Sequence, residues 1–498
     1  MLENGPPELE QQPRFGASLF KWTEYFSSKE GEITPSMSTF ILIWFGQVLS
    51  LVGSRTTTFA LSIWVYQHSN SATQFTLLIL STTLPAILIS PIAGVFVDRW
   101  SRRWIMIISD FCAGLCTLTI AWLFVSGNLE VWNLCLISAI SSGFSAFQGL
   151  AYSSATTLLV PKEQLGRASS MTQIRLSIAE ILSPALAAAL LVTIEIPGVV
   201  VIDLTTLCFA LVCLLVVKFP EVQTTEANRE EVELFSSFWQ EVTFGWHYLI
   251  ERPGLIGLVV FIAISNFLIG SAEALTTPLV LSFTSMQSLG TISSIASSGM
   301  LVGSFIMSIW GGIERLINII FTSMFFFGLF YVLAGLRPEP ILFTISEFFI
   351  FFIIPIVNGA IQVIYQKKVA PEVQGKVFAF RTAVTQGFLP LSYLIAGPLA
   401  DQVFEPLMAA DGLGAASIGQ IIGVGPGRGI GLMFIIMGIF SIVFTSIAYL
   451  YPRLRLLEDE LPDTTPLLGQ LGFSQAQDID ECLSQKLTSF EEHEPKPL

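Results

Sequence analysis

Long apolar stretches dominate the chain and alternate with short polar connections. A helix needs about 20 predominantly apolar residues to cross a bilayer, and the sequence contains twelve stretches of that kind. We predict membrane spans at 38–65, 72–97, 104–125, 131–158, 168–193, 198–217, 254–281, 288–310, 316–336, 340–365, 377–401 and 429–451. The pattern predicts an all-α integral membrane protein whose spans form two pseudo-symmetric bundles of six helices.

Polar segments flank and divide the two groups of spans. The dividing segment contains an amphipathic run over residues 232–250, which is typical of a helix that lies on a membrane surface or connects two halves. We therefore predict a cytoplasmic N-terminal segment 1–36, a first bundle 37–218, a cytoplasmic connector 219–252, a second bundle 253–452 and an acidic cytoplasmic tail 453–498.

The composition agrees with a membrane protein. Hydrophobic residues make up 52% of the chain and charged residues 12%, and the mean hydropathy is +0.69; soluble proteins carry about 25% charged residues. The formal net charge of −14 comes from the two tails and the connector, and the remaining residues have equal numbers of acids and bases. These values exclude an ordinary soluble enzyme and a disordered chain.

Basic residues gather on one side of the predicted spans. With the N-terminus in the cytoplasm, the opposite side carries only Arg337 and Arg428. The cytoplasmic side then carries Arg99, Arg102, Arg103, Lys162, Arg167, Lys218, Arg229, Arg252, Arg315, Lys367, Lys368, Lys376, Arg453 and Arg455. Because an excess of Lys and Arg marks the cytoplasmic side, we expect both termini in the cytoplasm and the protein in the cell membrane.

The connections after the fourth and tenth spans resemble each other. Residues 160–168 read VPKEQLGRA and residues 369–377 read VAPEVQGKV, and both place a Pro, an acid and a Gly-basic pair just before the next helix. Equivalent positions in the two groups indicate an internal repeat, although basic helix-starting turns also recur in membrane proteins without one. Duplicated halves around a midplane site are typical of secondary transporters.

The connection between the second and third spans reads GVFVDRWSRR over residues 94–103. This run resembles the Gly-x-x-x-Asp-Arg-x-x-Arg-Arg/Lys signature of the major facilitator superfamily, at the same place in the topology. The resemblance covers about residues 38–452 and is greatest to the drug-efflux branch with macrolide exporters and the enterobactin exporter. The residues that carry the branch resemblance are Gly46-Gln47, Gly53-Ser54, 160–168, 369–377, 397–401 and 425–431.

The resemblance implies a conformational latch at Gly94, Asp98, Arg99, Arg102 and Arg103, which joins the two halves when the cytoplasmic side is closed. On the residues alone, Gly94 permits close approach of neighbouring backbones, and Asp98 is suited to cap or pair with a neighbouring helix N-terminus. The simpler alternative is that the basic cluster only sets the orientation of the protein.

Five charged residues within the predicted spans are candidates for proton or charge coupling: Glu180, Glu273, Glu347, Arg55 and Asp203. A charge at the centre of a membrane helix costs about 2.5–3.5 kcal/mol on insertion scales, so each is a functional candidate. Removal from water favours the neutral form of a carboxyl group, which suits reversible protonation. The alternatives are a static ion pair with Arg55 or a water-exposed vestibule, and Arg55 could also favour an anionic substrate.

Three further charged residues, Asp110, Arg175 and Arg381, lie nearer the predicted cytoplasmic side, where long basic side chains can reach water. The fifth span reads EILSPALAA over residues 180–188. This run is similar to the Gly-Pro-x-x-Gly-Gly antiporter motif of the superfamily, with Ser and Ala in place of the glycines, which leaves antiport plausible.

By resemblance, the substrate site lies near the midplane between spans 1, 4, 5, 7, 10 and 11. Candidate polar lining residues are Gln47, Gln148, Gln173, Asn266, Asn358 and Gln386. The leading interpretation is a secondary active transporter that exports amphipathic small molecules or secondary metabolites by proton-coupled alternating access.

Two other functions stay open: a proton-coupled uptake symporter, and a transport-dead sensor or scaffold that acts through its acidic tail. A membrane enzyme is disfavoured because no nucleophile–base pair, metal-ligand cluster or Walker motif emerges from the sequence. We expect no catalytic residue, metal or cofactor, and an ion gradient as the energy source. The expected partners are the lipid bilayer and a small-molecule substrate, with no nucleic acid, and the expected state is a monomer.

Overall fold

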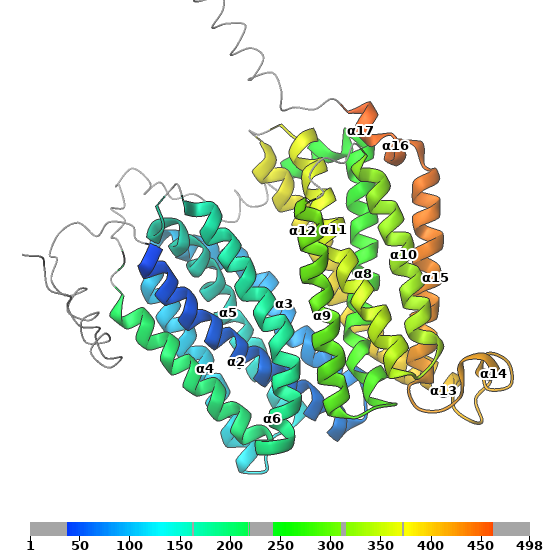
Figure 1. The fold of residues 1–498 in the computed structure, drawn as a ribbon, viewed down its shortest axis with the longest axis horizontal. Coiled ribbons are helices and arrows are strands. Elements are labelled where there is room, and N and C mark those ends of the chain that lie inside the picture. The colour runs from blue at the N-terminus through cyan, green and yellow to red at the C-terminus, as the bar shows by residue number, and fades with distance from the viewer. Residues whose placement is uncertain are drawn as a thin grey trace, which may run out of the picture.

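The computed structural model describes residues 37–161, 164–217, 219, 243–309, 315–370 and 373–461, apart from the side chains of Asp98 and Arg99. The regular elements within these ranges are helices, arranged as two bundles (Figure 1). Eleven of the described helices are long and apolar enough to cross a membrane. The predicted all-helical membrane fold is confirmed.

The first bundle contains α2 (Met37–Ser69), α3 (Ala72–Arg99), α4 (Arg102–Val125), α5 (Val131–Leu159) and α6 (Leu165–Val216). With 52 residues, α6 would be about 78 Å long as one straight helix, whereas the hydrocarbon core is about 30 Å thick. Its backbone breaks at Glu195, where φ is 55° and ψ is −173°, two residues before Pro197. The break divides α6 into two spans, so this bundle has six, as the sequence predicts.

The second bundle contains α8 (Pro253–Leu281), α9 (Met286–Ile309), α10 (Leu316–Leu336), α11 (Pro340–Lys368), α12 (Gln374–Leu399) and α15 (Arg428–Leu450). After α12 the chain continues through the π-helix η4 (Ala400–Phe404) and α13 (Glu405–Leu407). Three short helices lie at the ends of the bundle: α14 (Gly419–Ile422), α16 (Pro452–Arg455) and α17 (Leu457–Glu460). Together the two bundles provide twelve spans.

Figure 1 places α16 and α17 at one end of the second bundle and α13 and α14 at the other. We call these ends of the molecule the terminal side and the loop side. Within the predicted connector, residues 243–250 are helical, whereas residues 220–242 lie outside the described residues. The division into five segments drawn from the sequence therefore stays a prediction.

Small residues bring α2 and the second half of α6 into close contact. A Cβ atom added to Gly53 would overlap the hydroxyl oxygen of Thr206 and lie 3.1 Å from Oδ1 of Asp203. Ser54, the next residue, donates a hydrogen bond of 2.9 Å to the same carboxylate oxygen. Close backbone approach at small residues is a common way for helices to associate in lipid, and here it accounts for the Gly53-Ser54 pair.

The two bundles touch at α6 with α9 and at α3 with α12, and they converge toward the loop side (Figure 1). The hydroxyl of Ser294 on α9 donates a hydrogen bond of 2.7 Å to the carbonyl of Ile181 on α6. A Cβ atom added to Gly290 would overlap Ala188 and lie 2.7 Å from the carbonyl oxygen of Pro184. The small residues around Pro184 in the fifth span therefore form part of the contact between the halves.

Candidate functional site

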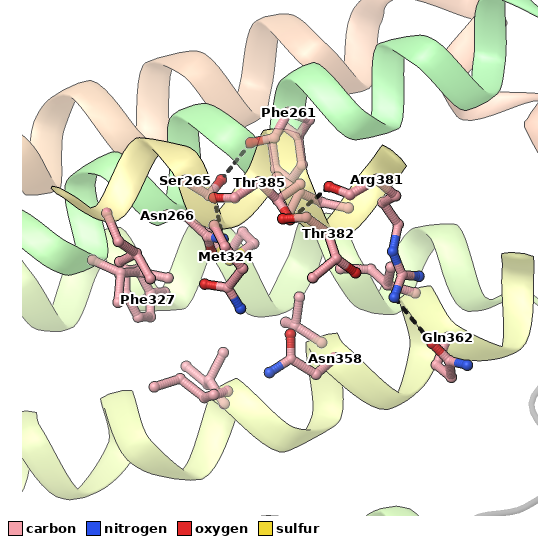
Figure 2. Close-up of a pocket in the computed structure, with 18 of the residues that line it drawn as sticks. Phe261, Ser265, Asn266, Met324, Phe327, Asn358, Gln362, Arg381, Thr382 and Thr385 are labelled. Atoms are coloured by element: carbon pink, nitrogen blue, oxygen red, sulfur yellow. Dashed lines mark hydrogen bonds between the residues drawn. The ribbon is translucent and has the colours of Figure 1, made fainter. Parts of the chain in front are cut away.

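A pocket of about 530 Å³ lies inside the second bundle, between α8, α10, α11 and α12 (Figure 2). Its volume falls within the usual range for small-molecule sites. Aromatic and aliphatic side chains provide the apolar walls, among them Phe261, Ile269, Met324, Phe327 and Leu389. The polar groups are the side chains of Ser265, Asn266, Asn358, Gln362, Thr382, Thr385 and Gln386, together with the charged Glu273 and Arg381.

Three of the six amide side chains expected to line a cavity lie in this pocket: Asn266, Asn358 and Gln386. Asn266 is held in place because its Nδ2 donates a hydrogen bond of 3.0 Å to the carbonyl of Thr385 on α12. The hydroxyl of Thr385 in turn donates to the carbonyl of Arg381 at 2.9 Å. These bonds fix one amide and leave several donors and acceptors facing the pocket.

The other three amides do not line this pocket, and for Gln47 the expectation was wrong. Gln47 is only 3% exposed, because its Nε2 donates to Oδ2 of Asp110 at 3.1 Å and its Oε1 accepts from Nε2 of Gln148 at 2.6 Å. This chain of hydrogen bonds lies inside the first bundle and satisfies a buried acid. Gln173 is exposed on α6, away from the residues that line the pocket.

Charged residues from both halves meet beyond the loop-side end of the pocket. Nη1 of Arg55 on α2 lies 3.4 Å from Oε1 of Glu180 on α6, and both side chains are about half exposed. Glu273 on α8 interacts electrostatically with this pair from the other half. Its Oε2 also accepts a hydrogen bond of 3.4 Å from the hydroxyl of Tyr393 on α12. Three charged groups predicted separately from the sequence thus form one cluster across the interface.

Two further candidates for coupling are more enclosed. Glu347 on α11 is 5% exposed and lies beside Thr276, within electrostatic range of Glu273. Asp203 is 3% exposed and accepts the hydrogen bond from Ser54, so it joins α2 to α6. Glu347 therefore extends the charged cluster into the second bundle, whereas Asp203 lies within the packing of the first.

The residues of the expected latch lie on the terminal side. Nε of Arg102 donates to the hydroxyl of Ser154 at 3.4 Å, and Arg103 donates to the carbonyls of Leu214 and Leu215, all within the first bundle. A Cβ atom added to Gly94 would meet open space, so the close approach expected there is absent in this conformation. The side chains of Asp98 and Arg99 lie outside the described ones.

Asp401 joins the two halves on the loop side and was not among the expected site residues. Its carboxylate accepts hydrogen bonds from the hydroxyl of Ser71 at 2.6 Å and from the backbone N–H groups of Ala72 at 3.0 Å and Thr73 at 2.8 Å. Nearby, a Cβ atom on Gly397 would overlap the hydroxyl oxygen of Thr76. The spacing Gly397-x-x-x-Asp401 matches Gly94-x-x-x-Asp98 in the latch, a signal that could have identified it.

Two six-span bundles in contact across a charged cluster, with a pocket inside the second bundle, are the architecture of a secondary transporter with two halves. The comparison of families agrees with the architecture. The model of the Major Facilitator Superfamily matches residues 43–389, and the chain belongs to this family of multi-pass membrane transporters.

Similar curated proteins are drug-efflux transporters. Macrolide efflux protein A of Streptococcus pyogenes is 28% identical over 388 residues, which cover 73% of this chain and 90% of the relative. The multidrug efflux pump Tap of Mycobacterium tuberculosis is 24% identical over 381 residues, which cover 72% of this chain and 86% of the relative. The resemblance to the drug-efflux branch is thereby confirmed.

Solved structures share the fold at lower identity. A bacterial homologue of the human lysosomal transporter Spinster, in an inward-facing and unoccupied conformation, has a TM-score of 0.64 and 14% identity and covers 86% of this chain and 99% of its own. The nucleoside transporter NupG has a TM-score of 0.60 and 12% identity and covers 83% of this chain and 99% of its own.

Proposed function

We propose that the protein is a proton-coupled exporter of amphipathic small molecules that works by alternating access in the cell membrane. It uses an ion gradient and no bound cofactor, and it acts as a monomer. The observation that carries the proposal is the electrostatic interaction of Glu273, which lines the pocket, with the Arg55–Glu180 pair of the other half. The efflux relatives support export as the direction.

The lining of the pocket supports an amphipathic substrate. Phe261 and Phe327 supply apolar surface, while Asn358 and Gln386 supply hydrogen-bonding groups. Apolar walls with a few positioned polar groups are typical of small-molecule sites. A molecule with a large apolar body and a few polar substituents fits this lining better than a sugar, which would need polar partners on every side.

The charged cluster supports coupling to protons. Glu180 and Glu273 both interact with one basic residue, Arg55, and Glu347 interacts with Glu273. A change in the distance between the halves alters the contact of Glu273 with Arg55 and Glu180, and this gives proton binding a direct effect on the conformation.

The basic residues and the contacts between the halves support an orientation of the protein in the membrane. Arg102, Arg103, Lys367 and Lys376 lie at the terminal side, which we assign to the cytoplasm. The four hydrogen bonds between the halves among the described residues are made by Asp401 and Ser294, both in the loop-side half of the bundle. The described conformation is therefore closed toward the exterior.

Retention of an amphipathic fluorescent dye tests this function in cells that lack their own exporters. Expression of the protein should lower dye retention, and a protonophore should restore it. Glu273→Gln should abolish the effect, whereas Glu130→Gln, at an exposed acid outside the cluster, should preserve it at equal expression. Faster dye accumulation on expression would instead indicate uptake, and unchanged retention across a panel of dyes would contradict export of amphipathic molecules.

A further inference from the structure

We propose that Arg381 forms an anion-binding subsite at the terminal-side end of the pocket and that this subsite selects amphipathic molecules carrying one carboxylate. The proposal rests on the exporter function above and names its substrate class. Arg381 lies on α12, two turns from the start of that helix, and its side chain lines the pocket.

The guanidinium of Arg381 is positioned by one hydrogen bond and two aromatic rings. Its Nη2 donates a hydrogen bond of 3.1 Å to Oε1 of Gln362 on α11. Its central carbon lies 4.8 Å from the ring centroid of Tyr365 and 5.1 Å from that of Phe378. Figure 2 shows Arg381 and Thr382 on one wall of the pocket, with Gln362 and Asn358 on the facing wall. A planar guanidinium supported on aromatic rings is preorganised for a carboxylate.

The charge of Arg381 has no anionic partner among the described residues. It forms no ion pair with a described carboxylate, and its Nη1 is buried without an acceptor from this part of the chain. Glu273 is too far away to be the counter-ion of Arg381. It lies at the level of Tyr393, which is twelve residues, or about 18 Å, along α12 from Arg381. A partly buried cation without a counter-ion is unfavourable, and an anionic substrate would supply one.

Arg175 in the first bundle provides the contrast. Its guanidinium also lies over a tyrosine, at 4.3 Å from the ring centroid of Tyr152. However, Asp110 on α4 is close enough to interact electrostatically with Arg175. The first half therefore balances its stacked arginine with a residue of its own, and the second half leaves the corresponding charge to the contents of the pocket.

The rest of the pocket defines the remainder of the ligand. Phe261 and Phe327 lie between Arg381 and the loop-side end and suit an apolar body. The carboxylate of Glu273 at that end opposes a second negative charge. The geometry therefore favours a monocarboxylate with an aromatic or aliphatic body over a dicarboxylate that places an anion at each end.

Binding of a matched pair of probes tests the proposal. Pyrenebutanoic acid and its neutral primary amide have the same apolar body, and fluorescence anisotropy can follow each with the full chain in lipid nanodiscs, corrected with protein-free discs. Wild-type protein should bind the acid about tenfold more tightly than the amide, as expected for a hydrogen bond to a charged group. Arg381→Gln should remove this preference and preserve amide binding, and Arg381→Lys should restore part of it.

Gln362→Glu gives a second variant that retains the arginine. The new carboxylate would lie at the position that now accepts from Nη2 of Arg381, and it should occupy the subsite and remove the preference for the acid. Arg175→Gln is the matched control and should preserve the preference. Equal affinity of the wild-type protein for the acid and the amide would overturn the subsite. So would a ratio of the two affinities that stays unchanged in both Arg381→Gln and Gln362→Glu. Arginine-dependent binding without export would leave the subsite standing and refute the exporter function.

Discussion

Asp401 and Thr73 join the two halves of the protein: Oδ2 of Asp401 accepts a hydrogen bond of 2.8 Å from the backbone N–H of Thr73, in the first turn of α3. The first N–H groups of a helix have no partner within it, and a carboxylate there also interacts favourably with the helix dipole. Because the bond crosses from one bundle to the other, it must break when the loop side opens.

Asp401→Asn should therefore shift the protein toward the state that is open on the loop side. Loss of about 1.5 kcal/mol, the lower value for a hydrogen bond to a charged group, corresponds to about a tenfold shift in the equilibrium. Electron–electron distance measurements between spin labels at Asn128→Cys and Leu413→Cys, in a background without native cysteines, would follow it. Both positions are exposed on the loop side.

Glu405→Gln provides the control for Asp401→Asn. The carboxylate of Glu405 accepts from the N–H groups of Gly427 and Ile430 at 3.0 Å, so it caps a helix within its own half. Its replacement should lower stability and leave the distance between the halves unchanged. An identical distance distribution for Asp401→Asn and wild type under every pH and substrate condition would contradict the role of Asp401 in closure.

Neutralising Arg55 and Glu180 should show whether they take part in proton coupling or form only a structural ion pair. Glu180→Gln leaves Arg55 without its partner, and the double variant Arg55→Gln/Glu180→Gln removes both charges. If the pair is only structural, the double variant should recover proton-dependent efflux, since neither member of the pair is left without the other. We predict instead that efflux loses its proton dependence in both variants, as measured by pH-gradient-driven flux.

Glu273→Gln should reduce proton-driven flux at least as strongly, because Glu273 is the acid that faces the pair from the other half. Glu347→Gln tests whether the enclosed acid behind it contributes. Proton-dependent transport that persists when Glu180, Glu273 and Glu347 are each replaced by Gln would refute this mechanism. Glu130→Gln, at an exposed position outside the cluster, serves as the reference.

The contact between α9 and α11 depends on a glycine. A Cβ atom on Gly303 would overlap the carbonyl oxygen of Phe352 and lie 2.9 Å from Cγ of Pro355. Gly303→Ala should destabilise the protein by about 1–3 kcal/mol, the usual cost of overpacking, and lower the midpoint of thermal unfolding in detergent. Gly149→Ala, where the added atom meets open space, should leave the midpoint unchanged; equal midpoints for both variants would refute the steric explanation.

The start of the acidic tail packs against the second bundle. The carboxylate of Glu458 accepts from the N–H groups of Leu316 at 3.2 Å and Ile317 at 2.9 Å, and its carbonyl accepts from Nζ of Lys368 at 2.7 Å. Deletion of residues 462–498 should therefore retain flux and thermal stability, whereas deletion from residue 456 should lower both. Loss of the cellular phenotype with intact flux after the shorter deletion would favour the scaffold function.

The spans could be predicted from the sequence because bilayer thickness sets a length that twelve apolar stretches meet. The break at Glu195 was also foreseeable, since the predicted fifth and sixth spans end and begin on either side of it. The side of each helix that faces the pocket was harder to predict from the sequence. Gln47 and Asn266 are both amides within spans. Gln47 donates its hydrogen bond to a buried acid, Asp110, whereas Asn266 lines the pocket.

Charge partners were the least predictable part of the site. Arg55 and Glu180 lie on different helices, and only the packing of α2 against α6 places them 3.4 Å apart. The sequence placed Arg381 nearer the cytoplasmic side, but it did not indicate the contacts with aromatic rings and Gln362 that hold the side chain beside the pocket. Such contacts depend on the rotation of each helix about its axis, which apolar periodicity does not define in helices buried among other helices and lipid.

Transport by the purified protein tests the central claim most directly. Proteoliposomes would be prepared at acidic internal pH and diluted into alkaline or matched buffer that contains an amphipathic dye, with the sidedness of the protein determined by labelling the variant Leu413→Cys. An outward-directed proton gradient should drive dye uptake through molecules whose terminal side faces out, and Glu273→Gln should abolish this uptake. Dye movement that is equal with and without the gradient, or unaffected by Glu273→Gln, would contradict proton-coupled export.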